Sequence, residues 1–232
     1  MTHHILPPYY RDSGRVPLAS RISYAARKRI FGFFMDQMDP SRETSVLDIG
    51  VTSDFSFRES NFFEQFYPYK DRIVCVGTES AGHLERLYPG IRLVRVQPHE
   101  RLPFSDKEFD IAFSNAVVEH MGSAQAQRAF IQEACRIGRR VFIATPNRWF
   151  PVEHHTGVPL LHYLPKRMYR RILSWTPLEY WSHEQNLNFL TEQEFVALFP
   201  DRYPVKVKLI GVGFRPLTSN LVAYTSFRDR TT

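Results

Sequence analysis

One segment of the sequence joins an apolar strand pattern to polar residues that could hold a cofactor. Residues 45–57 read SVLDIGVTSDFSF, so that Asp48 lies near the end of the apolar run and Gly50 follows it. A glycine lets the backbone turn sharply and approach a ligand closely. The further glycines typical of a nucleotide-binding loop are absent, and Thr52 and Ser53 stand in their place. Because such residues hydrogen bond to nearby amides, we predict a cofactor loop built with polar side chains.

A second group of chemically active side chains lies in residues 145–171, which read TPNRWFPVEHHTGVPLLHYLPKRMYRR. Glu153, His154 and His155 are adjacent there, and imidazole is suited to accept a proton near neutral pH. The same three residues could be metal ligands, but adjacent residues rarely converge on one ion and no distal pair of ligands is evident. We therefore predict no metal site.

These residues must be positioned by a framework of strands and helices. Apolar runs typical of buried strands occupy residues 45–50, 72–80, 91–97, 109–115 and 140–147. Helical patterns occupy residues 19–39, 59–69, 81–89, 126–138 and 190–200. Gly138 is expected to end the helix that begins at residue 126. Two further strand patterns, residues 204–214 and 219–227, are separated by RPLT, which is short enough for a hairpin. Thr191 and Glu194 have the spacing of a capping box.

Strands that alternate with helices favour right-handed crossovers and a mostly parallel sheet with helices on both faces. We therefore predict an α/β, Rossmann-like fold with a seven-stranded sheet that ends in an antiparallel hairpin. A single domain is expected over residues 1–232. Its predicted parts are an N-terminal arm and helix (1–40), a cofactor-binding core (41–147), an aromatic and basic lid (148–187), and a last helix and hairpin (188–232).

The order of these elements and three motifs resemble one family. VLDIG is similar to the first motif of class I S-adenosylmethionine-dependent methyltransferases, and LPFSDKEFDIAFSNAVVEHM is similar to their segment around the fourth strand. EACRIGRRVFIATPN looks like the helix and fifth strand that follow. The motifs cover residues 25–147 and resemble methyltransferases of type 11. The resemblance implies S-adenosyl-L-methionine as cofactor and S-adenosyl-L-homocysteine as product.

The resemblance also implies roles for individual residues. Asp48 would help to fix the ammonium group of the cofactor, Gly50 would approach its methionine part, and Glu79 would accept hydrogen bonds from the ribose hydroxyls. Thr52 or Ser53 is expected to contact the methionine carboxylate, and Ser114 and Asn115 are expected near the methionine end. Pro98 stands where relatives often have an acid that binds adenine, so Gln97 or His99 would have to recognise the ring instead. His120 is interpreted as a hydrogen-bonded core histidine.

Methyl transfer from a sulfonium depends largely on positioning, and an oxygen acceptor benefits from a base. His154 or His155 is the hypothesised base, in a lid over the substrate; a structural aromatic-rich insertion is the alternative. The resemblance implies an acceptor that is a small molecule, a sugar or a precursor of cell-surface glycan or lipid, and with it a bacterial protein of polysaccharide biosynthesis. A non-catalytic binding or regulatory protein is the main alternative, and RNA methylation has only the positive charge to support it.

The composition limits the partners and the compartment. The formal net charge is +6, with basic residues concentrated at 21–29 and 166–171. The second cluster is interleaved with apolar residues, so it could contact an anionic membrane or a phosphorylated carrier, or be a solvated helix face. Nucleic acid is not an expected partner. No secretory signal or apolar span is recognised, and two buried free cysteines are expected, so we predict a cytoplasmic protein.

Overall fold

The computed structural model describes residues 18–54, 57, 59–80, 82–201 and 203–225. The predicted N-terminal arm therefore lies outside the described residues except for its end. Seven strands form one sheet in the order β3-β2-β1-β4-β5-β7-β6. The strands are β1 Val46–Ile49, β2 Ile73–Gly77, β3 Arg92–Arg95, β4 Phe109–Asn115, β5 Gly138–Pro146, β6 Lys206–Ile210 and β7 Asn220–Tyr224. The strand order reverses between β1 and β4, where open α/β sheets bind ligands.

The pairing confirms the predicted mostly parallel sheet. Strands β1 to β5 are parallel to one another, whereas β7 runs antiparallel to both β5 and β6. The final strands are shorter than predicted, because β6 ends at Ile210 and β7 begins at Asn220. The intervening loop includes Gly211 and Gly213, both with positive φ, which replaces the tight turn expected at RPLT.

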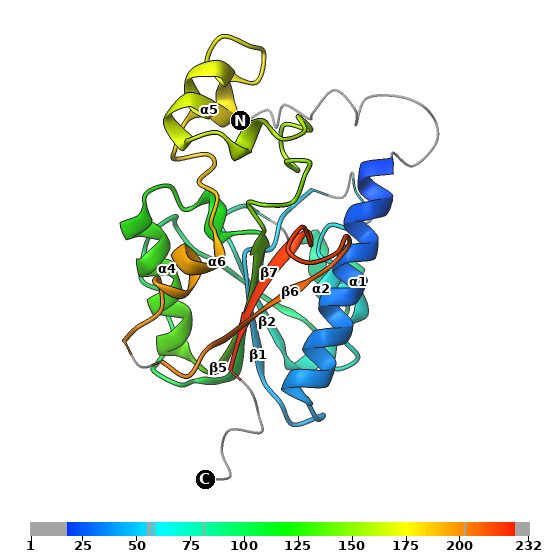
Figure 1. The fold of residues 1–232 in the computed structure, drawn as a ribbon. Coiled ribbons are helices and arrows are strands. Elements are labelled where there is room, and N and C mark those ends of the chain that lie inside the picture. Colours follow the sequence, from blue (N-terminus) through cyan, green and yellow to red (C-terminus); the bar gives the residue numbers. More distant parts are fainter. Residues whose placement is uncertain (1–17, 55–56, 58, 81, 202, 226–232) are drawn as a thin grey trace.

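Helices cover both faces of the sheet (Figure 1). Helices α1 Leu18–Met38, α2 Phe62–Phe66 and α3 His83–Leu87 contribute to a core on one face. Helices α4 Ala124–Ile137 and α6 Glu192–Val196 contribute to the core on the other. Phe34 of α1 is fully buried and packs edge-on against Phe63, Phe113 and Phe142, so an aromatic cluster fastens α1 to the sheet.

Gly138 joins α4 directly to β5. The helix ends at Ile137 with Gly138 as its C-cap, as predicted, but Gly138 has an extended φ of −85° and already belongs to β5. A Cβ at this position would lie 2.7 Å from the Cβ of Ala112. The glycine is therefore required by the close approach of β4 rather than by a left-handed cap.

The segment between β5 and α6 forms a layer over the carboxyl ends of the strands (Figure 1). It contains the 3-10 helices η4 Leu161–Tyr163 and η5 Glu179–Ser182 and the helix α5 Lys166–Leu173. Its own apolar cluster consists of Tyr169, Leu173, Leu187 and Phe189. Helix α6 begins with the predicted capping box of Thr191 and Glu194. No helix in the described part of the chain has the length and apolar character needed to cross a membrane.

Candidate active site

The loop after β1 depends on Gly50. The N–H groups of Gly50 and Val51 both donate to the carbonyl of Val76, at 2.8 and 3.1 Å, which holds the loop against the end of β2. Gly50 has a φ of +110°, and a Cβ there would overlap the side chain of Val117. The glycine thus serves both the turn and the close approach of the segment after β4.

Side chains stabilise the remainder of this loop, as the sequence predicted. The Thr52 hydroxyl accepts from the N–H of Asp54 at 3.1 Å. Asn61 holds Thr52 from both sides, because its Oδ1 accepts from the Thr52 N–H at 3.0 Å and its Nδ2 donates to the Thr52 carbonyl at 2.9 Å. Polar side chains thereby replace the missing glycines in fixing the loop.

Glu79, which follows β2, is tied to the same loop. The N–H of Ser53 donates to Glu79 Oε2 at 3.0 Å, and the Ser53 hydroxyl donates to the same oxygen. These bonds place a carboxylate beside the end of β1. Ser53 therefore positions Glu79, and it does not itself line the cavity described next.

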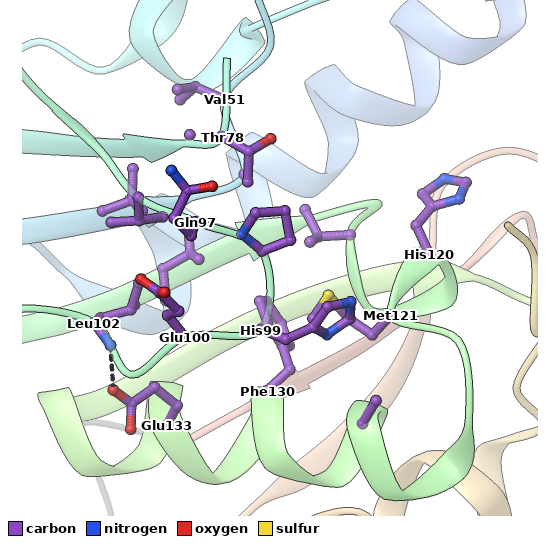
Figure 2. Close-up of a pocket in the computed structure, with 18 of the residues that line it drawn as sticks. Val51, Thr78, Gln97, His99, Glu100, Leu102, His120, Met121, Phe130 and Glu133 are labelled. Atoms are coloured by element: carbon purple, nitrogen blue, oxygen red, sulfur yellow. Dashed lines mark hydrogen bonds between the residues drawn. The ribbon is translucent and has the colours of Figure 1, made fainter. Parts of the chain in front are cut away.

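A cavity of about 770 Å³ opens at the carboxyl ends of β1 to β4 (Figure 2). Such a volume suits a cofactor of drug-like size. The predicted residues that line it are Gly50, Thr52, Glu79, Gln97 and His99. The loop that carries Gln97 and His99 is fastened to α4, since Glu133 accepts from the Leu102 N–H at 2.9 Å (Figure 2).

Asp48 does not line this cavity. Its side chain is buried and hydrogen bonds to the buried Glu64 of α2. Burial and the neighbouring acid raise the pKa of Asp48, and burial likewise raises the pKa of Glu64. The thiol of Cys75 donates to Glu64 at 3.2 Å. Asp48 therefore belongs to an interior carboxyl pair, not to a surface that could touch an ammonium group.

The two predicted residues at the end of β4 have different surroundings. Ser114 is buried and donates to the Ile49 carbonyl at 2.7 Å, so its hydroxyl joins β4 to β1. Asn115 lines neither this cavity nor the second cavity described below, but its buried Oδ1 has no hydrogen-bond partner among the described residues. A buried amide oxygen without a donor is uncommon and suits contact with a ligand.

A second cavity of about 600 Å³ lies beneath the predicted lid, against α1. Its lining includes Arg27 of α1, Asn147 after β5, and Glu153 and His154 from the segment after β5. Ala116, directly after β4, lines both cavities. The two cavities are therefore neighbours at the end of β4, with Ala116 bordering both.

The two predicted catalytic histidines differ in position. His154 lines the second cavity, and burial together with nearby positive charge lowers its pKa to about 3. His155 lines neither cavity, and its Nδ1 contacts Glu153 Oε1 at 2.7 Å. Burial disfavours the charged forms of both Glu153 and His155, but the attraction between the carboxylate and the imidazolium is stronger than this effect. The pKa of Glu153 therefore falls to about 2, and the pKa of His155 rises. Of these two histidines, His154 is the one that lines a space that could hold a substrate.

Two further polar residues approach His155. His120, interpreted from sequence as a hydrogen-bonded core residue, does contact the Asn186 carbonyl through Nδ1 at 2.7 Å, but it also lines the first cavity (Figure 2). Its ring lies 4.7 Å from that of His155, between centroids. Glu119 is 1% exposed and accepts from the Thr145 hydroxyl at 3.0 Å. This group could not be predicted from the sequence because its members come from segments about 35 residues apart; the adjacent acid and imidazole at Glu119 and His120 were the available signal.

Comparisons with known proteins agree with this architecture. Residues 68–140 match the family model of a methyltransferase domain. No curated protein matches the sequence. A Thermotoga maritima S-adenosylmethionine-dependent methyltransferase, described as a possible histamine N-methyltransferase, is similar in structure with a TM-score of 0.55 at 15% identity, over 90% of this chain and 92% of that one.

Two other similar structures differ in the reactions their names describe. The N-methyltransferase NodS of Bradyrhizobium japonicum, solved with S-adenosyl-L-homocysteine, has a TM-score of 0.54 at 11% identity and 86% coverage of both chains. The geranyl diphosphate C-methyltransferase of Streptomyces coelicolor has a TM-score of 0.53 at 11% identity, over 84% of this chain and 78% of that one. At such identities the likeness shows the fold alone. Residues 68–140 therefore match a methyltransferase domain, and the chain as a whole has the fold of these S-adenosylmethionine-dependent methyltransferases.

Proposed function

We propose that the protein methylates an oxygen atom of an acceptor held in the second cavity. S-adenosylmethionine, bound in the first cavity, supplies an electrophilic methyl group and leaves as S-adenosylhomocysteine. The observation that carries this proposal is that Ala116, at the end of β4, borders both cavities. In-line displacement requires the methyl donor and the acceptor to approach each other at one point, which this arrangement provides.

The residues around the first cavity suit that cofactor. The carboxylate of Glu79 can accept from two ribose hydroxyls, and Gly50 leaves the backbone open beside it. Thr52 lines the cavity and would contact the methionine carboxylate, and Gln97 and His99 line it and would recognise adenine. The unpartnered Oδ1 of Asn115 suits a donor such as an ammonium group. Ser53 supports the site by holding Glu79, and Ser114 does so by joining β4 to β1. Asp48 contributes through its buried pair with Glu64.

The second cavity suits a hydroxylated acceptor. Its lining combines Arg27, Arg148 and Asn147, which can hydrogen bond to sugar or phosphate oxygens, with His154 as the imidazole able to accept the hydroxyl proton. We assign the base to His154 rather than His155 because only His154 faces this cavity. A sugar or a glycan or lipid precursor, in bacterial polysaccharide biosynthesis, fits these groups. Two buried free cysteines support action in a reducing compartment such as the cytoplasm.

Helix α5 offers a surface for a lipid-linked or phosphorylated acceptor. Met168, Ile172 and Trp175 are exposed, with Trp175 at 82%, beside Arg167 and Arg171. Lys166 and Arg170 instead form ion pairs with Glu194 and Glu184, at 3.1 and 3.5 Å. The exposed basic and apolar side chains together suit the interface of an anionic membrane.

Calorimetric titration with S-adenosylmethionine and S-adenosylhomocysteine tests the cofactor assignment. We expect one site, with binding weakened by Glu79→Ala because the ribose acceptor is lost. Absence of binding at millimolar ligand would favour a binding or regulatory protein on a methyltransferase scaffold. Unchanged binding in Glu79→Ala would contradict the assigned role of that residue.

A further inference from the structure

We propose that Glu119, His120 and His155 form a binding site for one divalent transition-metal ion, zinc by the chemistry of the ligands. One carboxylate oxygen and one nitrogen of each imidazole lie within 4.8 Å of one another. Two histidines and a glutamate are a ligand set that binds zinc with one position left for water or substrate. Glu119 and His120 come from η3 Val118–His120, and His155 comes from the segment after β5.

The carboxylate of Glu119 is the first argument for an ion. The residue is 1% exposed, and its Oε2 accepts from the Thr145 hydroxyl at 3.0 Å. Its Oε1 is buried and accepts no hydrogen bond within the described part of the chain; His120 Nε2 lies 4.0 Å away. A buried carboxylate oxygen without a donor is costly. A cation at this point would satisfy it.

The orientation of the two imidazoles is the second argument. The Nδ1–H of His120 donates to the Asn186 carbonyl at 2.7 Å, and the Nδ1–H of His155 donates to Glu153 at 2.7 Å. Each of these bonds leaves Nε2 as the nitrogen that can bind a metal. Histidines that ligate metals are usually held in this way, by a carbonyl or a carboxylate on the other nitrogen. All three proposed ligands therefore already have the outer partner that orients them.

The distances require a small inward movement. Zinc–nitrogen bonds of 2.0–2.1 Å place tetrahedral ligand atoms about 3.4 Å apart, which is less than the present spread. The side chain of His120 is 35% exposed, so a small shift of its ring toward the other two ligands meets solvent on one side. His120 also lines the first cavity, so the ion would lie beside the cofactor space. The fourth coordination position of the ion, which no protein ligand fills, could bind an oxygen of the methyl acceptor. That role rests on the proposed function, whereas the metal binding itself does not.

A purely structural polar network is the competing explanation. In that case His155 would connect Glu153 and Glu119 without an ion, and added metal would find no specific site. Metal titration of the protein in the absence of S-adenosylmethionine separates the two explanations. It also separates failure of this proposal from failure of the proposed methyl transfer.

The experiment is calorimetric titration of chelator-treated full-length protein with zinc chloride. We expect one ion per chain, and Glu119→Gln should weaken binding by more than about 10-fold because it removes the charged ligand while retaining an acceptor for Thr145. His183→Ala is the matched control: His183 is an exposed imidazole in the same lid, and its loss should leave the affinity unchanged. A stoichiometry near zero, or equal affinity in Glu119→Gln, would overturn the proposal.

Two further measurements keep the result interpretable. If Glu119→Gln does not fold, Glu153→Gln keeps all three proposed ligands, removes the charge of the partner of His155 and should weaken zinc binding by about 10–100-fold. The Trp181 ring lies 4.8 Å from that of His155, between centroids, so cobalt at this site should quench its fluorescence. Quenching that persists unchanged in His155→Ala would place the ion elsewhere and contradict the assignment.

Discussion

Glu79 Oε2 accepts a 3.0 Å hydrogen bond from the backbone N–H of Ser53, and the Ser53 hydroxyl donates to the same oxygen. The carboxylate assigned to the cofactor ribose is thus held by the loop in which the expected glycines are missing. The polar residues of the loop after β1 therefore orient Glu79 as well as stabilising the turn of the loop itself. This relationship joins the ends of β1 and β2 and can be tested directly.

Ser53→Ala should weaken S-adenosylmethionine binding by up to about 10-fold, since one hydrogen bond that orients Glu79 is lost. The backbone bond to Glu79 remains, which limits the effect. Calorimetry on Ser53→Ala, Glu79→Ala and the double variant measures the coupling between them. Additive losses would show that Ser53 does not act through Glu79.

Gly50→Ala should destabilise the fold by about 1–3 kcal/mol and weaken cofactor binding, because its φ of +110° and the contact with Val117 both oppose a Cβ. Urea unfolding measures the first effect. Adding Val117→Ala should relieve the overlap but not the backbone strain, so only part of the stability should return. Full recovery would mean that the positive φ carries no cost here.

Asp48 and Glu64 should make stability depend on pH. Because their folded pKa values are raised, the native state retains protons that the unfolded chain releases. Their contribution is therefore fully present below the unfolded pKa values, about 4, and is lost as pH rises through the folded pKa values. Each retained proton makes stability fall by up to about 1.4 kcal/mol per pH unit in this window.

Glu64→Gln removes one of these protons but keeps a group that can hydrogen bond to Asp48. Urea midpoints between pH 4 and 8 should accordingly fall less steeply in this variant than in the original protein. Glu179→Gln, which changes an exposed glutamate, is the control and should leave the slope unaltered. Parallel pH profiles for Glu64→Gln and the original protein would contradict the buried carboxyl pair.

His154→Ala should reduce methyl transfer by about 100-fold or more if His154 accepts the acceptor proton, with cofactor affinity unchanged. Release of S-adenosylhomocysteine, measured with a panel of sugars and lipid-linked sugars, provides the assay. His183→Ala again serves as the exposed-histidine control. Retained activity in His154→Ala would remove this residue from the reaction.

Trp175→Ser should reduce co-sedimentation with vesicles of phosphatidylserine, because it removes the most exposed aromatic side chain next to α5. Arg171→Glu should have a similar effect by reversing a charge beside Trp175, whose ring lies 5.9 Å from the guanidinium. Phe214→Ser is a suitable control, since Phe214 is 72% exposed but belongs to the loop between β6 and β7. Equal sedimentation of all variants would exclude α5 as the contact.

Much of the framework could be predicted from local patterns. The apolar runs of the strands, the capping box at Thr191 and the end of α4 at Gly138 each depend on residues close together in the sequence, and each is present. The reason is that strand burial and helix caps are decided mainly by side chains within a few positions. Sequence position at strand ends likewise located Glu79, Gln97 and His99 at one cavity.

Only the tertiary structure decided which way the remaining polar side chains point. Asp48 and Gly50 are two residues apart, yet Asp48 faces the interior beside Glu64 while Gly50 borders the cavity. His154 and His155 are adjacent, yet one lines the second cavity and the other meets Glu119 and His120. Periodicity assigns residues to elements, but the partner that each side chain meets is supplied by distant segments. The sequence by itself therefore determined the fold and the cofactor edge, whereas packing between segments determined the chemistry available there.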